Sequence, residues 1–311
     1  MLHFTILGPG FSGGKVLFEY DGKELPITGP KKQFEYLPIK DRQSLGQDGR
    51  LSITAEGLVI DSNPFRHTVH SYQDRIKFHI GSRNPIELNG ITTVHMTGSV
   101  QTFGVENHPF GDQVSNPQSD PRLAAAAITA YGETGEHFSF TFTNQKIYAG
   151  INAMQRDALT EAMTGFTEYR IPLLVDTQAG KQHAVRLIFD KLWKRVLWYV
   201  DGQLMYEWRE GSVISKNYCV TRFGSKISPT FPRGKTIKIG LGTSSGLMSY
   251  APRVGESKED RALVMLEPGM INPNDDEKAN YVSESREEAW RLWDHGAVFT
   301  VGNIEVLRDR A

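Results

Sequence analysis

The stretch from His183 to Trp208 constrains the fold most, because its apolar residues fall at every second position. They are Val185, Leu187 and Phe189 in the first half, and Val196, Trp198 and Val200 in the second. A period of two is that of a β-strand with one buried face. Asp201-Gly202 supplies the two positive-φ residues that a tight hairpin needs. The stretch therefore predicts three strands joined by two turns.

Similar alternation recurs along the chain, and it predicts an all-β antiparallel sandwich. Within residues 138–144, Phe138, Phe140 and Phe142 must face the core, while the hydroxyl side chains between them share the other face. The other expected strands span residues 51–53, 58–60, 76–80, 92–103, 123–131, 147–151, 169–175, 218–223 and 237–241. Residues 15–25 read as two strands around an Asp21-Gly22 turn, and residues 26–48 as a loop.

Only two short peripheral helices are expected. Residues 152–165 place Met154, Leu159 and Met163 roughly on one face of a helix. A capping box, Ser285-Arg-Glu-Glu288, predicts a second helix near residues 285–295. No linker divides the chain, so we expect a single domain over residues 1–311, with an N-terminal strand and loop extension.

The run from His183 through Trp198-Tyr199-Val200-Asp201-Gly202 resembles paired strands of the concanavalin A-like lectin and glucanase superfamily. Residues 49–60 and 298–307 are similar to its early strand pair and its closing strand, and residues 108–124 resemble an uncharacterised branch of such sandwiches. The resemblance implies a jelly-roll, concanavalin A-like β-sandwich. It implies little about activity, because such a fold hosts many functions.

Composition excludes several classes of protein. The formal charge is −1, with 35 Lys and Arg against 36 Asp and Glu, so we expect no nucleic-acid partner. Cys219 is the only cysteine, which excludes an internal disulfide and indicates a reducing compartment. There is neither a secretory leader nor a long apolar run, so we expect a cytoplasmic protein without a membrane partner. A homo-oligomer stays open.

Histidines are the candidate catalytic groups. They are His67, His70, His95 and His108, with Asp112 placed to orient His108 across a Pro-Phe-Gly turn. His95 stands among small and β-branched residues, a pattern suited to a concave sheet face. The alternatives are structural: His67 and His70 point to opposite faces of an ideal strand and cannot share a metal, and Asp112 can instead form an Asx-type turn.

Polar and aromatic residues beside these histidines are the candidate substrate-binding groups. They are Tyr72, Tyr131, Asn144, Tyr148 and Tyr199. Plain solvent exposure of Tyr131 and Tyr148 is the competing interpretation. We expect no metal and no organic cofactor.

The glucanase motif Glu-x-Asp-x-x-Glu is missing, and the strands where it should lie, residues 123–131 and 138–144, contain no carboxylate. This exclusion leads to one main hypothesis, a cofactor-independent cyclase, isomerase or lyase acting on a small, largely apolar metabolite. The alternative is a carbohydrate-binding, lectin-like module or a glycan-active protein. A purely structural sandwich is the third hypothesis.

Overall fold

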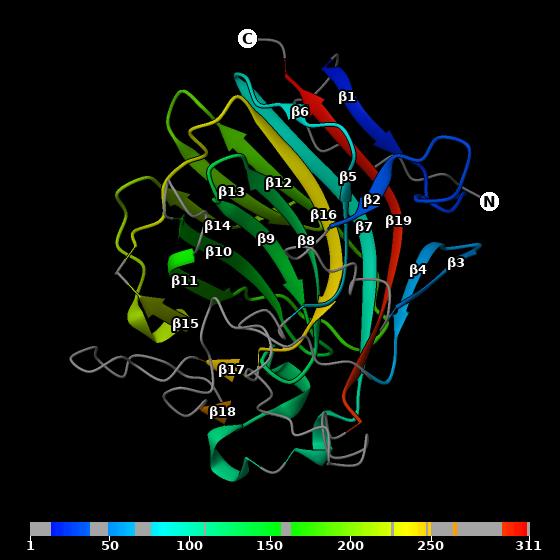
Figure 1. Cartoon of the computed structure of the whole chain (residues 1–311), viewed down its shortest axis with the longest axis vertical. Coiled ribbons are helices and arrows are strands. Elements are labelled where there is room, and N and C mark those ends of the chain that lie inside the picture. The colour runs from blue at the N-terminus through cyan, green and yellow to red at the C-terminus, as the bar shows by residue number, and fades with distance from the viewer. Residues whose placement is uncertain are drawn as a thin grey trace.

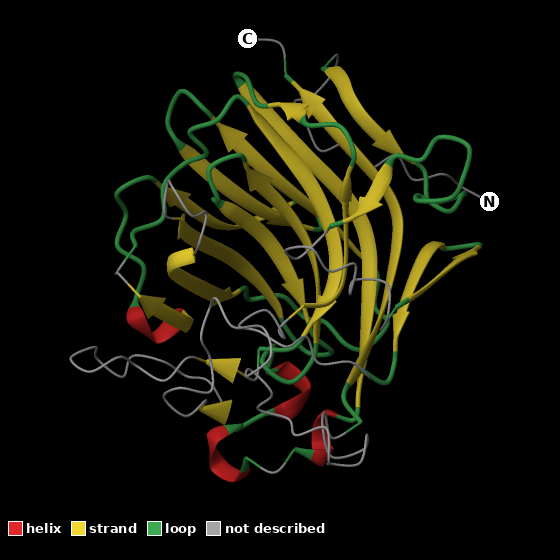
Figure 2. Cartoon of the chain, in the orientation of Figure 1, coloured by secondary structure: helices red, strands yellow, loops and turns green. Residues whose placement is uncertain are grey.

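The computed structural model describes residues 14–37, 49–65, 76–108, 110–156, 163–224, 227–246, 248–249, 264–265 and 294–309. These residues form two large antiparallel sheets that pack face to face (Figures 1 and 2). Both sheets bow in the same sense, and the nine-stranded sheet lies on the inner side of the bow (Figure 1). The predicted class, an all-β antiparallel sandwich, is confirmed.

The eight-stranded sheet has the order β14-β13-β12-β7-β19-β4-β3, with β1 beside β19. Its strands are β1 (Lys15–Tyr20), β3 (Arg50–Thr54), β4 (Gly57–Ser62), β7 (Ile91–Phe103), β12 (His183–Asp190), β13 (Arg195–Val200), β14 (Gln203–Arg209) and β19 (Gly296–Arg308).

The nine-stranded sheet has the order β15-β11-β10-β9-β8-β16-β5-β2, with β6 beside β16. Its strands are β2 (Phe34–Tyr36), β5 (Ile76–Ser82), β6 (Ile86–Glu87), β8 (Ala125–Gly132), β9 (His137–Phe142), β10 (Ile147–Arg156), β11 (Met163–Pro172), β15 (Cys219–Gly224) and β16 (Thr236–Ser244). A small parallel pair, β17 (Met248–Ser249) and β18 (Val264–Met265), lies apart.

The strands β12, β13 and β14 are the three strands predicted between His183 and Trp208. Asp201 (φ 49°) and Gly202 (φ 85°) form the expected positive-φ turn between β13 and β14. The Asp201 carboxylate accepts hydrogen bonds from the Ala184 N–H at 2.9 Å and pairs with Nδ1 of the buried His183 at 2.7 Å. The hairpin turn is thus tied to the start of β12.

Aromatic side chains from both sheets fill the core. Phe138 of β9 contacts the rings of Phe189, Trp198 and Trp208, with centroids 5.4–6.1 Å apart. Trp198 also donates its indole N–H to the Ser139 carbonyl at 2.8 Å, so it bonds to the opposite sheet. Phe138, Phe140 and Phe142 are all buried, as predicted.

Two local predictions are wrong. Residues 152–156 continue β10 and residues 163–165 begin β11, so no helix occupies these parts of the expected 152–165 segment. Pairing with β9 and β11 on either side overrides a modest helical periodicity. At the N-terminus, β1 forms as expected, but residues 21–25 make no second strand, and the expected loop contains β2. β2 forms because it pairs with β5, which is distant in sequence.

The described helices are short 3₁₀ turns: η2 (Val105–Asn107), η3 (Gly111–Gln113), η4 (Pro117–Ser119) and η5 (Lys216–Tyr218). Among the described residues, no helix has the length and apolar character needed to cross a bilayer. The helix expected near residues 285–295 lies outside the described residues, apart from its last two positions.

Candidate functional site

One face of the nine-stranded sheet packs in the core, whereas its outer face carries mostly polar side chains together with tyrosine and histidine rings. Ile128, Phe138, Ile151 and Ile171 point into the core. The residues between them point outward, and we call this surface the site face. Its defining residues are His79 (β5), Tyr131 and Thr129 (β8), His137, Ser139 and Thr141 (β9), Tyr148, Gly150 and Asn152 (β10), and Glu168 and Arg170 (β11).

Three rings form a strip across the site face. Tyr131 lies between His79 and His137, with ring centroids 6.3 Å and 5.7 Å away. Glycines beneath the strip make room for it. A Cβ on Gly240 would overlap Nε2 of His79 and lie 3.1 Å from Cε1 of Tyr131, and a Cβ on Gly81 would overlap the Tyr131 hydroxyl. The rings of His79 and Tyr131 therefore rest directly on the backbone of β5 and β16.

Two hydroxyls on the site face are buried without a hydrogen-bond partner among the described residues. They are the Tyr131 hydroxyl and Thr141 Oγ1. A buried hydroxyl normally has a partner, since leaving one unpaired costs about 1–3 kcal/mol. Both hydroxyls therefore keep an unused hydrogen-bonding capacity within the described part of this face.

A polar cluster flanks the other end of the site face. Arg170 forms an ion pair with Glu168 and donates to the Asn152 side-chain oxygen at 2.9 Å. A Cβ on Gly150 would lie 2.8 Å from the guanidinium, so this glycine lets Arg170 lie against the sheet. Burial lowers the pKa of Arg170 to about 10, which leaves it cationic at neutral pH.

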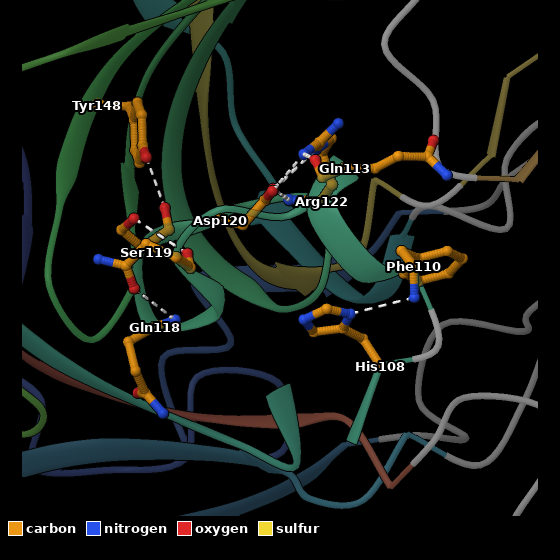
Figure 3. A network of polar contacts seen from close by, with 9 residues as sticks. His108, Phe110, Gln113, Gln118, Ser119, Asp120, Arg122 and Tyr148 are labelled. Atoms are coloured by element: carbon orange, nitrogen blue, oxygen red, sulfur yellow. Dashed lines mark hydrogen bonds and ion pairs between the residues drawn. The ribbon is translucent and has the colours of Figure 1, made fainter. Parts of the chain in front are cut away.

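The segment from Gly104 to Leu123 is held against one end of the site face (Figure 3). The Tyr148 hydroxyl donates to the Ser119 carbonyl at 2.5 Å. Asp120 pairs with Arg122, which also donates to the Gln113 carbonyl at 2.9 Å (Figure 3). Tyr148 therefore shapes this end of the face while its hydroxyl anchors the segment.

His108 and Asp112 lie in this segment but are not hydrogen-bonded to each other. His108 Nδ1 accepts from the Phe110 N–H at 3.2 Å, and the two rings stack at 6.0 Å (Figure 3). The Asp112 side chain is exposed at the first turn of η3. The expected orientation of the imidazole by this carboxylate is absent from this part of the structure, because the Phe110 backbone occupies Nδ1.

Asn144 is engaged in joining the two sheets. Its side chain accepts from the Thr102 N–H at 2.7 Å and donates to the Thr102 carbonyl at 2.9 Å and to Gln118 Oε1 at 2.5 Å. Both functional atoms are thus used within the protein, which favours a structural role over the predicted contact with substrate.

His95 and Tyr199 lie on the opposite side of the sandwich. They alternate with the core residues Val94, Met96, Trp198 and Val200, so they point away from the site face. Tyr199 stacks with Arg186, whose guanidinium carbon is 5.0 Å from the ring centroid. Arg186 on β12 is the cross-strand neighbour of His95 on β7. The expectation that His95 lines the concave face is wrong, because β7 belongs to the other sheet. His67, His70 and Tyr72 lie outside the described residues.

Of the predicted residues, the structure therefore brings Tyr131 and Tyr148 together on one face. It adds His79, His137, Asn152 and Arg170, which the sequence analysis missed. His79 had a detectable signal, since it alternates with the core residues Phe78 and Ile80. Asn152 was missed because it falls within the segment that was wrongly predicted to be a helix.

Carboxylates are sparse on the site face. Among the outward residues of the described strands are Glu87 on β6, which pairs with Arg308, Glu168 on β11 and Glu35 on β2. Glu168 and Glu35 lie at opposite sides of the sheet. Six strand-to-strand steps separate them, which is about 29 Å at the usual strand spacing. Retaining glycosidases hold their two carboxyl groups only about 5 Å apart. These two groups therefore cannot act as such a pair. No group of three metal-ligating side chains occurs in the described part of the chain.

Burial keeps two histidines neutral, and we expect this to make stability depend on pH. It lowers the pKa of His79 and of His295 from 6.5 to about 4, with the nearby His108 adding to the effect at His295. Between pH 6.5 and pH 4 the unfolded chain binds protons that the folded chain does not. The stability present above pH 6.5 is therefore lost as the pH falls to 4, by at most about 3 kcal/mol per histidine.

Urea unfolding at pH 7, 5.5 and 4 measures this loss. His79→Gln keeps a polar side chain but removes one titration, so its stability should fall less than that of the wild type. Carboxylates titrate alike in both proteins, and identical losses would contradict a buried, neutral His79.

The fold and the site face together define a β-sandwich with a polar, aromatic surface on one sheet. Residues 17–310 match the model of a family of unknown function (DUF6081), and the chain belongs to this family. No functionally curated protein matches the sequence.

Solved structures also match the chain at low sequence identity, among them the following three. The laminarinase catalytic domain from Thermotoga maritima MSB8 is 10% identical with a TM-score of 0.47, over 96% of this chain and 100% of that one. The Bacillus licheniformis β-glucanase is 11% identical with a TM-score of 0.42, over 96% and 100%. An endo-acting O-glycanase from the human gut microbiota is 11% identical with a TM-score of 0.48, over 95% and 100%. None of these activities is assigned to this chain.

Proposed function

We propose that the protein binds a saccharide chain along the site face. The observation that carries this proposal is the combination, on one face, of a ring strip, a floor of small hydroxyl residues and a polar cluster. Sugars present hydroxyl edges and flat C–H faces, so they are recognised by aromatic rings together with convergent hydrogen-bonding groups.

The size of the face suits an extended ligand. From β5 to β11 it crosses five strand-to-strand steps, which is about 24 Å. The ring strip covers the β5 side, and Asn152, Glu168 and Arg170 cover the β11 side. Ser139 and Thr129 lie between them in one cross-strand row, flanked by Gly150 and Gly240.

The polar lining favours this function over the small, largely apolar substrate expected from the sequence. Along β8, β9 and β10, the outward side chains from Ala125 to Met154 are small, aromatic or polar, and Met154 is the only large aliphatic one. A purely apolar ligand would leave the unpaired hydroxyls of Tyr131 and Thr141 unsatisfied.

Calorimetry against neutral and acidic oligosaccharides tests the proposal. We expect binding by the wild type, and a loss of at least about tenfold, or 1.4 kcal/mol, in His79→Ala and Tyr131→Ala, because both variants break the ring strip. His95→Ala and Tyr199→Ala are matched controls on the opposite sheet and should bind normally. Loss of binding only in the two control variants would indicate that the saccharide binds to the other sheet. Stabilisation by apolar metabolites but by no saccharide would overturn the proposal.

A further inference from the structure

His79 and Tyr131 are an unusual pair within the ring strip, since neither side chain has a hydrogen-bond partner among the described residues. The Tyr131 hydroxyl is buried and unpaired. His79 makes only the ring contact with Tyr131, and its backbone carbonyl accepts from the Leu37 N–H. Nε2 of His79 and the Tyr131 ring converge over Gly240, while the Tyr131 hydroxyl lies over the neighbouring Gly81.

Two cationic side chains lie beside this pair and could contact an anionic ligand. Glu35 is shared by two cations, Lys238 at 3.0 Å and Arg83 at 4.0 Å. Lys238 is the cross-strand neighbour of Tyr131. Two cations thus lie on this side of the strip, together with the carboxylates of Glu35 and of Glu133, which accepts a hydrogen bond from Thr236 on the same strand as Lys238.

We propose that His79 and Tyr131 are catalytic residues of a polysaccharide lyase, and that they cleave a uronate-containing glycan by β-elimination. This inference depends on the proposed saccharide-binding function. The glycan must carry a carboxylate, because the C–H bond next to a carboxylate is the one in a glycan that is acidic enough for an imidazole to remove its proton. Lys238 is placed to pair with that carboxylate and to stabilise the negative charge that develops there.

The two proton transfers of the elimination need only His79 and Tyr131. The neutral His79 imidazole takes the proton from the carbon next to the carboxylate, and the C–H electron pair becomes a new C=C bond. The bond from the neighbouring carbon to the glycosidic oxygen breaks, and its electron pair stays on the oxygen. The Tyr131 hydroxyl donates a proton to that oxygen. Transfer of the proton from His79 to Tyr131 then restores both groups.

The protonation states suit these roles. Burial lowers the pKa of His79 to about 4, so the imidazole is a free base at neutral pH. Burial, and secondarily the Glu35 carboxylate, raises the pKa of Tyr131, so the phenol remains protonated. Two groups whose environments push their pKa values apart can serve as base and acid.

The test uses the purified chain with polygalacturonate, alginate and glucuronan, and with their carboxyl-reduced, neutral forms. Binding is measured by calorimetry, and elimination by the ultraviolet absorbance of the unsaturated uronate product. We expect the wild type to bind at least one polyuronate and to produce the unsaturated end. Tyr131→Phe and His79→Gln should lower the rate at least about 100-fold while changing affinity less than about tenfold. His95→Gln and Tyr199→Phe, on the opposite sheet, should keep the wild-type rate.

The outcomes separate the two proposals. Binding without an unsaturated product overturns the lyase and leaves the saccharide-binding function intact. New reducing ends formed without the ultraviolet absorbance of an unsaturated product would indicate hydrolysis. This outcome would also overturn the lyase proposal. Wild-type rates in both Tyr131→Phe and His79→Gln exclude the two residues as acid and base. Binding of no saccharide removes both proposals.

Discussion

Replacing Trp198 with alanine should destabilise the protein by about 3–5 kcal/mol, the usual cost of removing a buried tryptophan. The side chain is fully buried, and its ring contacts Phe138 and Tyr206, with centroids 6.1 and 5.5 Å away. Its indole N–H also satisfies the Ser139 carbonyl at 2.8 Å. Urea unfolding at pH 7 measures the loss.

Two conservative variants separate the hydrogen bond from the packing. Trp198→Phe keeps an aromatic ring but leaves the Ser139 carbonyl without its donor, so it should cost about 1–3 kcal/mol beyond the lost volume. Trp208 is the matched control, because it is equally buried against Phe138 but its indole N–H has no partner among the described residues. Trp208→Phe should therefore cost less. Equal losses would show that the Trp198 hydrogen bond adds nothing to stability.

The second prediction concerns Gly240, one of the two glycines beneath the ring strip. Gly240→Ala should push His79 and Tyr131 off the sheet, because the new Cβ would overlap Nε2 of His79. Once the imidazole moves toward water, its pKa should rise from about 4 toward the ordinary value of 6.5. An NMR titration of the His79 ring protons measures this directly, without any ligand. Saccharide binding should weaken about 100-fold, because the strip loses its alignment.

Gly98→Ala is the matched control on the central strand of the other sheet. Its Cβ is also crowded, 2.9 Å from the Thr300 carbonyl oxygen and 3.2 Å from Cε of Met96. Overpacking in either variant should cost about 1–3 kcal/mol of stability. Only Gly240→Ala should shift the pKa of His79. A pKa that stays near 4 in Gly240→Ala would mean that the rings adjust without leaving the sheet.

The candidate site could be predicted only in part, and His95 and Tyr131 show why. Both are polar residues at outward positions of well-predicted strands. The alternation of apolar and polar residues predicts which side chains share one face of a strand, but it does not predict in which sheet that strand lies. β8 pairs with β9 and β16, whereas β7 pairs with β12 and β19, and these partners are distant in sequence except for β9.

The hairpin from β12 to β14, the inward phenylalanines of β9 and the sandwich class followed from the sequence alone. Period-two alternation and a positive-φ turn are local properties, set by residues a few positions apart. The ring strip was decided by tertiary structure. His79, Tyr131 and Gly240 come together only because β16 inserts between β5 and β8, a long-range pairing that no local pattern specifies.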